Sequence, residues 1–211
     1  MKREAMWAPA SGTGLESLRL ERDGNSWVAD GIILGLRDGR PFRCIYQLTC
    51  DRAWNVRQVS IDIPGGEPAV LRLRADGKGG WETALGEPQN DLAGALTVDL
   101  SATPFTNTLE IRRLRLEPGQ AQDVVAAHVD IPSLALRPAR QRYTCLAAAT
   151  ATTPGRYRYE DSSGFAAELT VDADGLVIDY PGQFARAWAD AATDGGGAAP
   201  GIEPGLDDPK G

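Results

Sequence analysis

The sequence has few of the side chains from which metal centres and nucleophilic active sites are built. Its 211 residues include one histidine, His128, and three cysteines, Cys44, Cys50 and Cys145. This odd set of thiols has no zinc-ligand spacing. The chain also has neither a Gly-x-Ser-x-Gly elbow nor a glycine-rich phosphate loop. We therefore predict no metal ion, no cofactor and no catalytic triad, and we interpret His128 as a solvated or second-layer histidine.

The chain also lacks a long apolar run and an excess of basic charge. No stretch reaches the roughly 18 apolar residues that a membrane-spanning helix needs, and the first seven residues lack the apolar region of a secretory signal. With 22 basic and 29 acidic residues the net charge is −7, and no basic stripe is present to neutralise phosphates. These absences predict a cytoplasmic protein that does not bind nucleic acid.

The last 22 residues differ in composition from the rest of the chain. Residues 190–211 hold six glycines, three prolines and no aromatic residue. Five acids against Lys210 give this segment a net charge of −4, which leaves −3 for the remainder. Such a segment buries too little apolar surface to offset the entropy lost on ordering. We predict a disordered acidic tail over 190–211, after a single folded domain at 1–189.

Short apolar runs that alternate with polar residues, and are separated by Gly, Pro and Asp, indicate an all-β domain. The predicted strands cover 15–22, 26–35, 42–50, 55–63, 69–74, 92–100, 111–116, 121–131, 140–146, 156–160, 165–172 and 176–180. So many strands without alternating helices favour an antiparallel sheet that curls to remove its edges. We predict a single antiparallel barrel, closed or half-open, with a central pocket and little helix.

The connections between these strands follow a recurrent pattern. Asp-Gly pairs at 23–24, 76–77 and 174–175 join alternating runs, and this pair is the strongest short signal of a tight hairpin. Residues 103–109 do not alternate and contain a proline, so we expect a loop or lid there. The best helix candidate is 183–192.

Two charged residues occupy positions that the alternation assigns to the apolar face of a strand. Glu16 shares its face with Leu18 and Leu20, and Arg57 shares its face with Val59 and Ile61. A charge among inward aliphatic side chains is costly unless it is paired, hydrogen-bonded or hydrated. Glu16 and Arg57 are therefore expected either to brace the sheet as an ion pair or to grip a polar head group in a pocket.

Four other residues are candidates for the same site. Tyr46 lies on the inward face of 42–50 and would add a hydroxyl group to an apolar wall. Trp54 lies beside a turn, as do Trp27 and Trp81, where each ring would plug the end of the barrel or line its entrance. Asn107 suits local backbone capping or ligand contact. In a strand over 111–116, Arg113 would join a small basic patch suited to an anionic head group.

The middle of the chain resembles a known family. Residues 101–109 (Ser-Ala-Thr-Pro-Phe-Thr-Asn-Thr-Leu), followed by Ile-Arg-Arg-Leu at 111–114, are similar to the signature of the "putative glycolipid-binding" family of bacterial proteins. Further matches are Tyr46…Cys50-Asp51…Trp54…Arg57 and the segments 141–145, 157–159, 171–177 and 179–181. The resemblance covers about residues 5–187.

The resemblance implies a many-stranded β-barrel or half-barrel similar in shape to the lipoprotein carriers LolA and LolB. Gly94-Ala95-Leu96-Thr97 precedes Val98 where the family is expected to have a cysteine and an acidic residue. No role is carried over for those two positions.

These observations together predict a protein that binds an amphipathic small molecule, a glycolipid or a similar lipid, without catalysis. Its apolar part would lie along inward Leu, Ile, Val and Phe side chains, with its head near Glu16 and Arg57. The alternative is an enzyme that acts on such a ligand, with Glu16 as acid or base and Arg57 as electrostatic stabiliser. Glycosidase chemistry would need a second carboxylate, for which Asp123 is the candidate.

Overall fold

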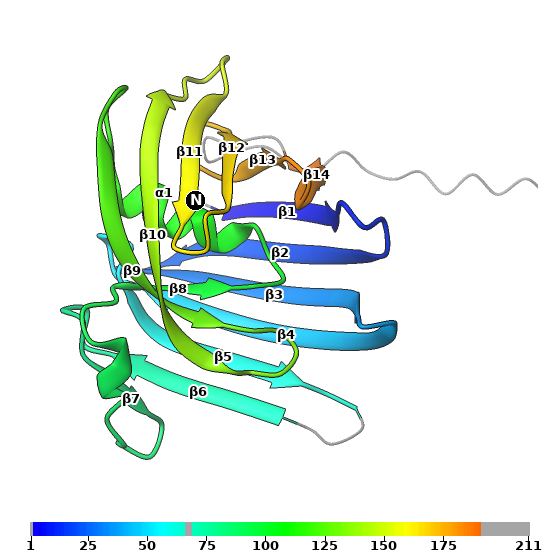
Figure 1. Ribbon diagram of the computed structural model, residues 1–211, viewed down its shortest axis with the longest axis vertical. Coiled ribbons are helices and arrows are strands. Elements are labelled where there is room, and N and C mark those ends of the chain that lie inside the picture. Colours follow the sequence, from blue (N-terminus) through cyan, green and yellow to red (C-terminus); the bar gives the residue numbers. More distant parts are fainter. Residues whose placement is uncertain (1, 66–68, 191–211) are drawn as a thin grey trace, which may run out of the picture.

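The computed structural model describes residues 2–65 and 69–190. Within these ranges one α-helix, one short 3₁₀ helix and fourteen strands are formed (Figure 1). Their bounds are β1 Lys2–Pro9, β2 Gly14–Asp23, β3 Ser26–Arg37, β4 Arg40–Cys50, β5 Val56–Ile63, β6 Ala69–Ala75, β7 Trp81–Thr83, the 3₁₀ helix Asn90–Leu92, β8 Thr97–Leu100, α1 Phe105–Leu114, β9 Ala121–Val129, β10 Leu136–Ala147, β11 Gly155–Asp161, β12 Ala166–Val171, β13 Val177–Tyr180 and β14 Phe184–Ala189.

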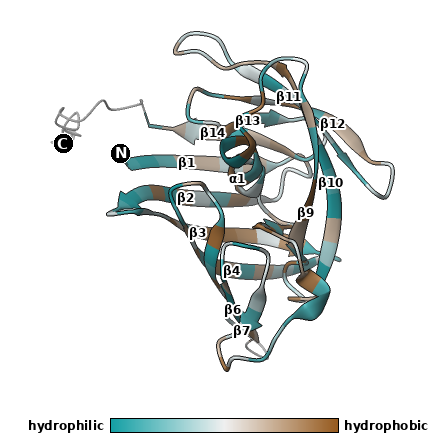
Figure 2. Cartoon of the chain, turned by 90° about the vertical axis from the view of Figure 1, so that its left-hand side faces the viewer, coloured by the Kyte–Doolittle hydropathy of each residue, from teal (hydrophilic) through white to brown (hydrophobic). Residues whose placement is uncertain are grey.

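All fourteen strands belong to one sheet, in the order β7-β6-β5-β4-β3-β2-β1-β14-β13-β12-β11-β10-β9-β8. The first and last strands of the sequence, β1 and β14, therefore pair in its middle. Neighbouring strands are antiparallel except β8 and β9, which are parallel. The sheet curves around α1 (Figure 2) but is not closed into a barrel, since β7 and β8 remain its edges. The backbone N–H of Val56 in β5 donates to the carbonyl of Leu96, just before β8, at 2.8 Å.

The prediction of an all-β fold with little helix is confirmed. The three Asp-Gly pairs at 23–24, 76–77 and 174–175 connect β2 to β3, β6 to β7 and β12 to β13. Gly24 has a φ of 57°, in the left-handed region that a tight hairpin requires and that glycine adopts without steric cost.

The prediction of a loop over 103–109 and a strand over 111–116 is wrong. Residues 105–114 form α1, which begins after Pro104 and ends at Arg115 with a left-handed φ of 50°. A fixed φ suits proline to the start of a helix, and the run of buried residues from Phe105 to Ile111 shows that tertiary packing stabilises this helix. Threonine and asparagine are poor helix formers, so the local sequence does not indicate it.

The prediction of a helix over 183–192 is also wrong. Residues 184–189 form β14, which pairs with β1 on one side and β13 on the other. One partner, β1, lies at the other end of the sequence and is a strand that the sequence analysis did not predict. The predicted strand over 92–100 is shortened to β8, because the 3₁₀ helix and a turn precede it.

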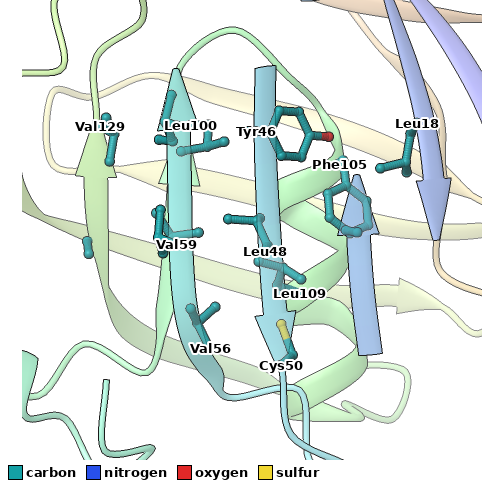
Figure 3. Packing of buried hydrophobic residues seen from close by; sticks show 14 of the residues in the cluster. Leu18, Tyr46, Leu48, Cys50, Val56, Val59, Leu100, Phe105, Leu109 and Val129 are labelled. Atoms are coloured by element: carbon teal, nitrogen blue, oxygen red, sulfur yellow. The ribbon is translucent and has the colours of Figure 1, made fainter. Parts of the chain in front are cut away.

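The space inside the curved sheet is largely filled. Inward residues of β2, β4 and β5, among them Leu18, Leu48 and Val59, are buried in one core with Phe105 and Leu109 of α1 (Figure 3). Leu100 of β8 and Val129 of β9 belong to the same core. The open cavities therefore lie beside this core and not at its centre, where the sequence predicted a pocket.

Cys44, Cys50 and Cys145 are all buried as free thiols. Asp190, the first residue of the predicted tail, is described and pairs with Arg3 at 2.9 Å. The rest of that predicted tail, 191–211, lies outside the described residues. No helix in the described ranges is long and apolar enough to cross a membrane.

Candidate functional site

Glu16 lies on the concave face of the sheet, as its place in the alternation predicted. It occupies β2, opposite Trp7 of β1 and Ile33 of β3. Only 2% of its surface is exposed to solvent. No Lys, Arg or His side chain forms an ion pair with Glu16 within the described residues, so hydrogen bonds alone stabilise this carboxylate.

Two hydroxyl groups hold one oxygen atom of this carboxylate. The hydroxyl of Tyr46 donates to Oε1 of Glu16 at 2.5 Å, and the hydroxyl of Thr103 donates to the same atom at 2.7 Å. Thr103 is itself fixed, because its Oγ1 accepts from the N–H of Phe105 at the start of α1, at 2.9 Å. The carboxylate is therefore oriented by one residue from the sheet and one from the segment just before α1.

The second oxygen atom, Oε2 of Glu16, is buried and has no hydrogen-bond partner. Only one other buried side-chain polar atom in the described ranges, Oγ1 of Thr108, shares this condition. Buried polar groups in folded proteins are nearly always hydrogen-bonded. A carboxylate oxygen without a donor therefore identifies a position at which a ligand hydroxyl or a water molecule would be stabilising.

Burial raises the pKa of Glu16 to about 7. The hydrogen bonds from Thr103 and Tyr46 act in the opposite direction, but they do not offset the loss of hydration. Desolvation also raises the pKa of Cys44 to about 12 and that of Tyr46 well above its ordinary value. Glu16 is therefore the group in this cluster that changes charge near neutral pH.

A glycine makes the Tyr46–Glu16 contact possible. Tyr46 lies opposite Gly31 in the β3–β4 pair. A Cβ atom at Gly31 would lie 2.1 Å from the Tyr46 ring, so no larger residue fits there without moving that ring. Gly35 likewise leaves room for the ring of Phe42, which would lie 2.8 Å from an added Cβ. The two aromatic rings thus lie flat across β3 on its concave face.

Glu16 lines a cavity of about 230 Å³ at the edge of the core. Most of its wall is apolar and includes Trp7, Ile33, Leu36, Phe42, Ile131 and Phe184. Leu34 and Leu36 also border the cavity, but they alternate with Ile33 and Gly35 in β3, so their half-exposed side chains lie on the opposite face of the sheet. The wall also includes the polar residues Ser11, Thr13, Arg37, Ser101 and Gln183. A buried acceptor among apolar and a few polar groups is typical of small-molecule sites.

The prediction that Arg57 faces the interior with Glu16 is wrong. The pairing of β4 with β5 shifts between Thr49 and Cys50, so that Arg57 is an extra, unpaired residue. Such a β-bulge interrupts the alternation of side chains. Arg57 is 44% exposed and lies 4.0 Å from Asp51, on a different part of the surface from Glu16. The ion pair between Glu16 and Arg57 does not form.

Trp54 is buried in the core and stacks on Trp27, with ring centroids 4.7 Å apart. The guanidinium group of Arg112 lies 5.3 Å from the centroid of the Trp54 ring, at cation–π distance. This packing matches the interpretation of Trp54 as a plug. Trp81 is also buried, and its Nε1 donates to the carbonyl of Ala95 at 2.8 Å.

Asn107 and Arg113 both belong to α1 and make internal contacts. Nδ2 of Asn107 donates to the carbonyl of Pro104 at 3.2 Å, and its Oδ1 accepts from the hydroxyl of Tyr143 at 2.9 Å. Arg113 donates to Oε2 of Glu110 from Nε at 2.9 Å and from a terminal nitrogen at 2.6 Å. Burial raises the pKa of Glu110, although Arg113 opposes this shift.

Arg113 also lines a separate open groove of about 780 Å³ between α1 and β9–β11. The structure therefore brings Tyr46 to Glu16 but places Arg57, Trp54 and Arg113 elsewhere, while Asn107 lines a neighbouring cavity that Thr103 also lines. Thr103 and Gly31 belong to the site and were not predicted from sequence.

The sequence matches the profile of a family described as "Putative glycolipid-binding" over residues 4–186. The fold is similar to the crystal structure of a DUF1089 family protein from Pseudomonas aeruginosa, with a TM-score of 0.72 and 36% sequence identity. That similarity covers 82% of this chain and 92% of the other. Among curated proteins, none is similar to this chain.

Proposed function

The chain belongs to the putative glycolipid-binding family, and we propose that it binds an amphipathic small molecule of the glycolipid type, without catalysis, in the cavity lined by Glu16. One observation carries this proposal: Oε2 of Glu16 is buried beside an apolar cavity and lacks a donor. A hydroxyl group of the ligand head would supply the missing hydrogen bond.

The energetics favour a hydroxyl-bearing ligand. A buried oxygen without a partner costs about 1–3 kcal/mol, which a ligand donor recovers on binding. A hydrogen bond to an ionised carboxylate is also about twice as strong as one between neutral groups. Tyr46 and Thr103 already fix the carboxylate, so little side-chain entropy remains to be lost when the ligand binds.

The apolar part of the ligand has a place beside the same residue. An alkyl chain inside the cavity would contact Trp7, Phe42 and Ile131 of its wall. Each methylene group removed from water there contributes about 0.8 kcal/mol. A buried chain of about eight carbons would therefore contribute about 6 kcal/mol, from which the cost of association is subtracted.

The enzyme alternative has no comparable support. Arg57, its electrostatic stabiliser, lies away from Glu16. Asp123, its second carboxylate, is 75% exposed and pairs with Arg142 at 2.8 Å. Within the described ranges no group of His, Cys, Asp and Glu side chains could hold a metal ion.

The proposal is tested by calorimetric titration of octyl glucoside, below its micellar concentration, into the purified protein at pH 8. Glu16 is largely ionised at that pH. We expect saturable binding that weakens about tenfold in Glu16→Gln, because a charge-assisted hydrogen bond is replaced by a neutral one. The control is Glu117→Gln, which changes an exposed carboxylate far along the chain. Equal affinity in wild type and Glu16→Gln would refute the assignment of the head group to Glu16.

A further inference from the structure

A second cavity adjoins the one lined by Glu16. It measures about 340 Å³ and shares Ser101, Gln183 and Phe184 with the wall of the first. Thr103 also lines the second cavity, while its hydroxyl binds Glu16. The two cavities are therefore neighbours within one site, and together they reach the size of roughly 300–1,000 Å³ that small-molecule sites have.

One wall of the second cavity carries a carboxylate–imidazole pair. Asp99 of β8 lies opposite His128 of β9 in the parallel pair, and Nδ1 of His128 lies 2.9 Å from Oδ2 of Asp99. Nε2 of Gln141 donates to the same oxygen at 2.8 Å, and the hydroxyl of Thr106 donates to Oδ1 at 3.3 Å. The carboxylate is thus held from β9, β10 and α1.

This pair leaves one nitrogen atom free. An ionised carboxylate accepts but does not donate, so Nδ1 of His128 carries the proton in this contact. Nε2 of a neutral His128 is then an acceptor, and no described residue donates to it. Asp99 therefore acts as a positioning residue that fixes both the ring and its tautomer.

The other wall is aromatic. Tyr159, Phe165, Tyr180 and Phe184 form a chain of tilted and edge-to-face contacts with centroid separations of 6.2–6.4 Å. All four line the cavity, and Phe165 and Phe184 are only partly buried. No described side chain hydrogen-bonds the hydroxyl of Tyr180, which is therefore available to a ligand.

From this geometry we propose that the second cavity binds the carbohydrate ring of the head group. Nε2 of His128 accepts from a sugar hydroxyl, and the partly exposed rings of Phe165 and Phe184 contact the apolar C–H face of the sugar. The carboxylates of Asp99 and Asp161 in the same wall disfavour an anionic head group such as a phosphate. This inference rests on the proposed function, since the alkyl chain of the same ligand leaves through the cavity of Glu16.

The test compares two ligands with the same eight-carbon chain, octyl glucoside and tetraethylene glycol monooctyl ether, by calorimetry at pH 8. In His128→Ala we expect octyl glucoside to bind about fivefold more weakly, the loss of one neutral hydrogen bond. The glycol ether, which has no ring, should bind that variant as well as it binds wild type.

Phe165→Ala is a second variant, should His128→Ala fold poorly, and it should weaken octyl glucoside selectively in the same way. Its control is Leu85→Ala, which truncates an apolar side chain that is 89% exposed. If both variants bind both ligands like wild type, the sugar subsite is refuted and the proposed function stands. An equal loss of affinity for both ligands also refutes the subsite, because it would show that the substitution acts through the structure of the protein. If wild type binds neither ligand, the proposed function itself fails.

Discussion

Replacing Glu16 by Gln should stabilise the protein above pH 7 and leave its stability nearly unchanged below pH 4.5. Glutamine keeps the size of the side chain and an oxygen atom that can accept from Tyr46 and Thr103. The substitution removes the ionisable carboxyl group. The difference in unfolding free energy between the two proteins therefore measures the cost of holding a charged Glu16 inside the fold.

The sign and size of this cost follow from the pKa. Burial raises the pKa of Glu16 from 4.5 to about 7 in the folded protein. Below pH 4.5 both states hold the proton, and ionisation changes nothing. Between pH 4.5 and 7 the unfolded chain releases the proton while the folded chain keeps it, so folding stability falls as pH rises. At about 1.4 kcal/mol per pH unit, the wild-type protein loses about 3 kcal/mol by pH 7 to 8.

Neighbouring groups do not titrate in this range. Desolvation raises the pKa of Cys44 to about 12 and that of Tyr46 well above its usual value, so both stay neutral. Arg37, which also lines the cavity, pairs with Asp130 at 2.8 Å. Other residues contribute equally to the unfolding free energies of wild type and variant, so their contributions cancel in the difference.

The assay is urea unfolding of wild type and Glu16→Gln at pH 4.5, 6 and 8, with the m-value checked for each. At pH 8 the variant should be about 3 kcal/mol more stable, or about 6 to 12 °C higher in Tm. Glu117→Gln, at an exposed site, should show no such trend. A difference that is the same at all three pH values, or a variant less stable at pH 8, would refute the reasoning.

Two further predictions concern the geometry of the site. Gly31→Ala should destabilise the fold by about 2 kcal/mol and weaken octyl glucoside binding, because an added Cβ would lie 2.1 Å from the Tyr46 ring and displace it; unfolding curves and calorimetry that match wild type would contradict this. Arg57→Ala should change stability by less than about 0.5 kcal/mol and leave octyl glucoside affinity intact, since Arg57 is exposed and distant from Glu16. A large loss of affinity there would restore the role that the sequence suggested for Arg57.

The strands and turns of this fold were predictable because their signals are local. Period-two alternation places Glu16, Leu18 and Leu20 on one face of β2, and the structure buries all three. The Asp-Gly pairs mark hairpins by the backbone conformation that they require. Such features depend on residues that are near one another in the chain.

The errors arise where distant contacts decide the outcome. α1 has poor helix formers at Thr106, Asn107 and Thr108, and its burial in the curve of the sheet stabilises it. Arg57 was misplaced because a β-bulge shifts the register, and a single extra residue reverses the apparent face of a side chain. Neither effect is visible in the alternation of one strand.

The candidate site was predictable only in part, for the same reason. The alternation of side chains along each strand predicted that Glu16 and Tyr46 face inward. Their contact, however, depends on Gly31 in the strand between them. Thr103 reaches Glu16 from the start of a helix that the sequence did not indicate. The pair of Asp99 and His128 forms across two parallel strands, so the single histidine looked isolated in the sequence.

The most direct test of the central claim is the pKa of Glu16 itself, measured by the ¹³C shift of its carboxyl carbon with and without octyl glucoside. The free protein should titrate near pH 7. Oε2 is already buried, so a ligand hydroxyl adds a hydrogen bond to the charged form with little further desolvation. Saturation with octyl glucoside should therefore lower this pKa. An unchanged pKa in the saturated protein would contradict the account, as would a Glu16 that titrates near 4.5 without ligand.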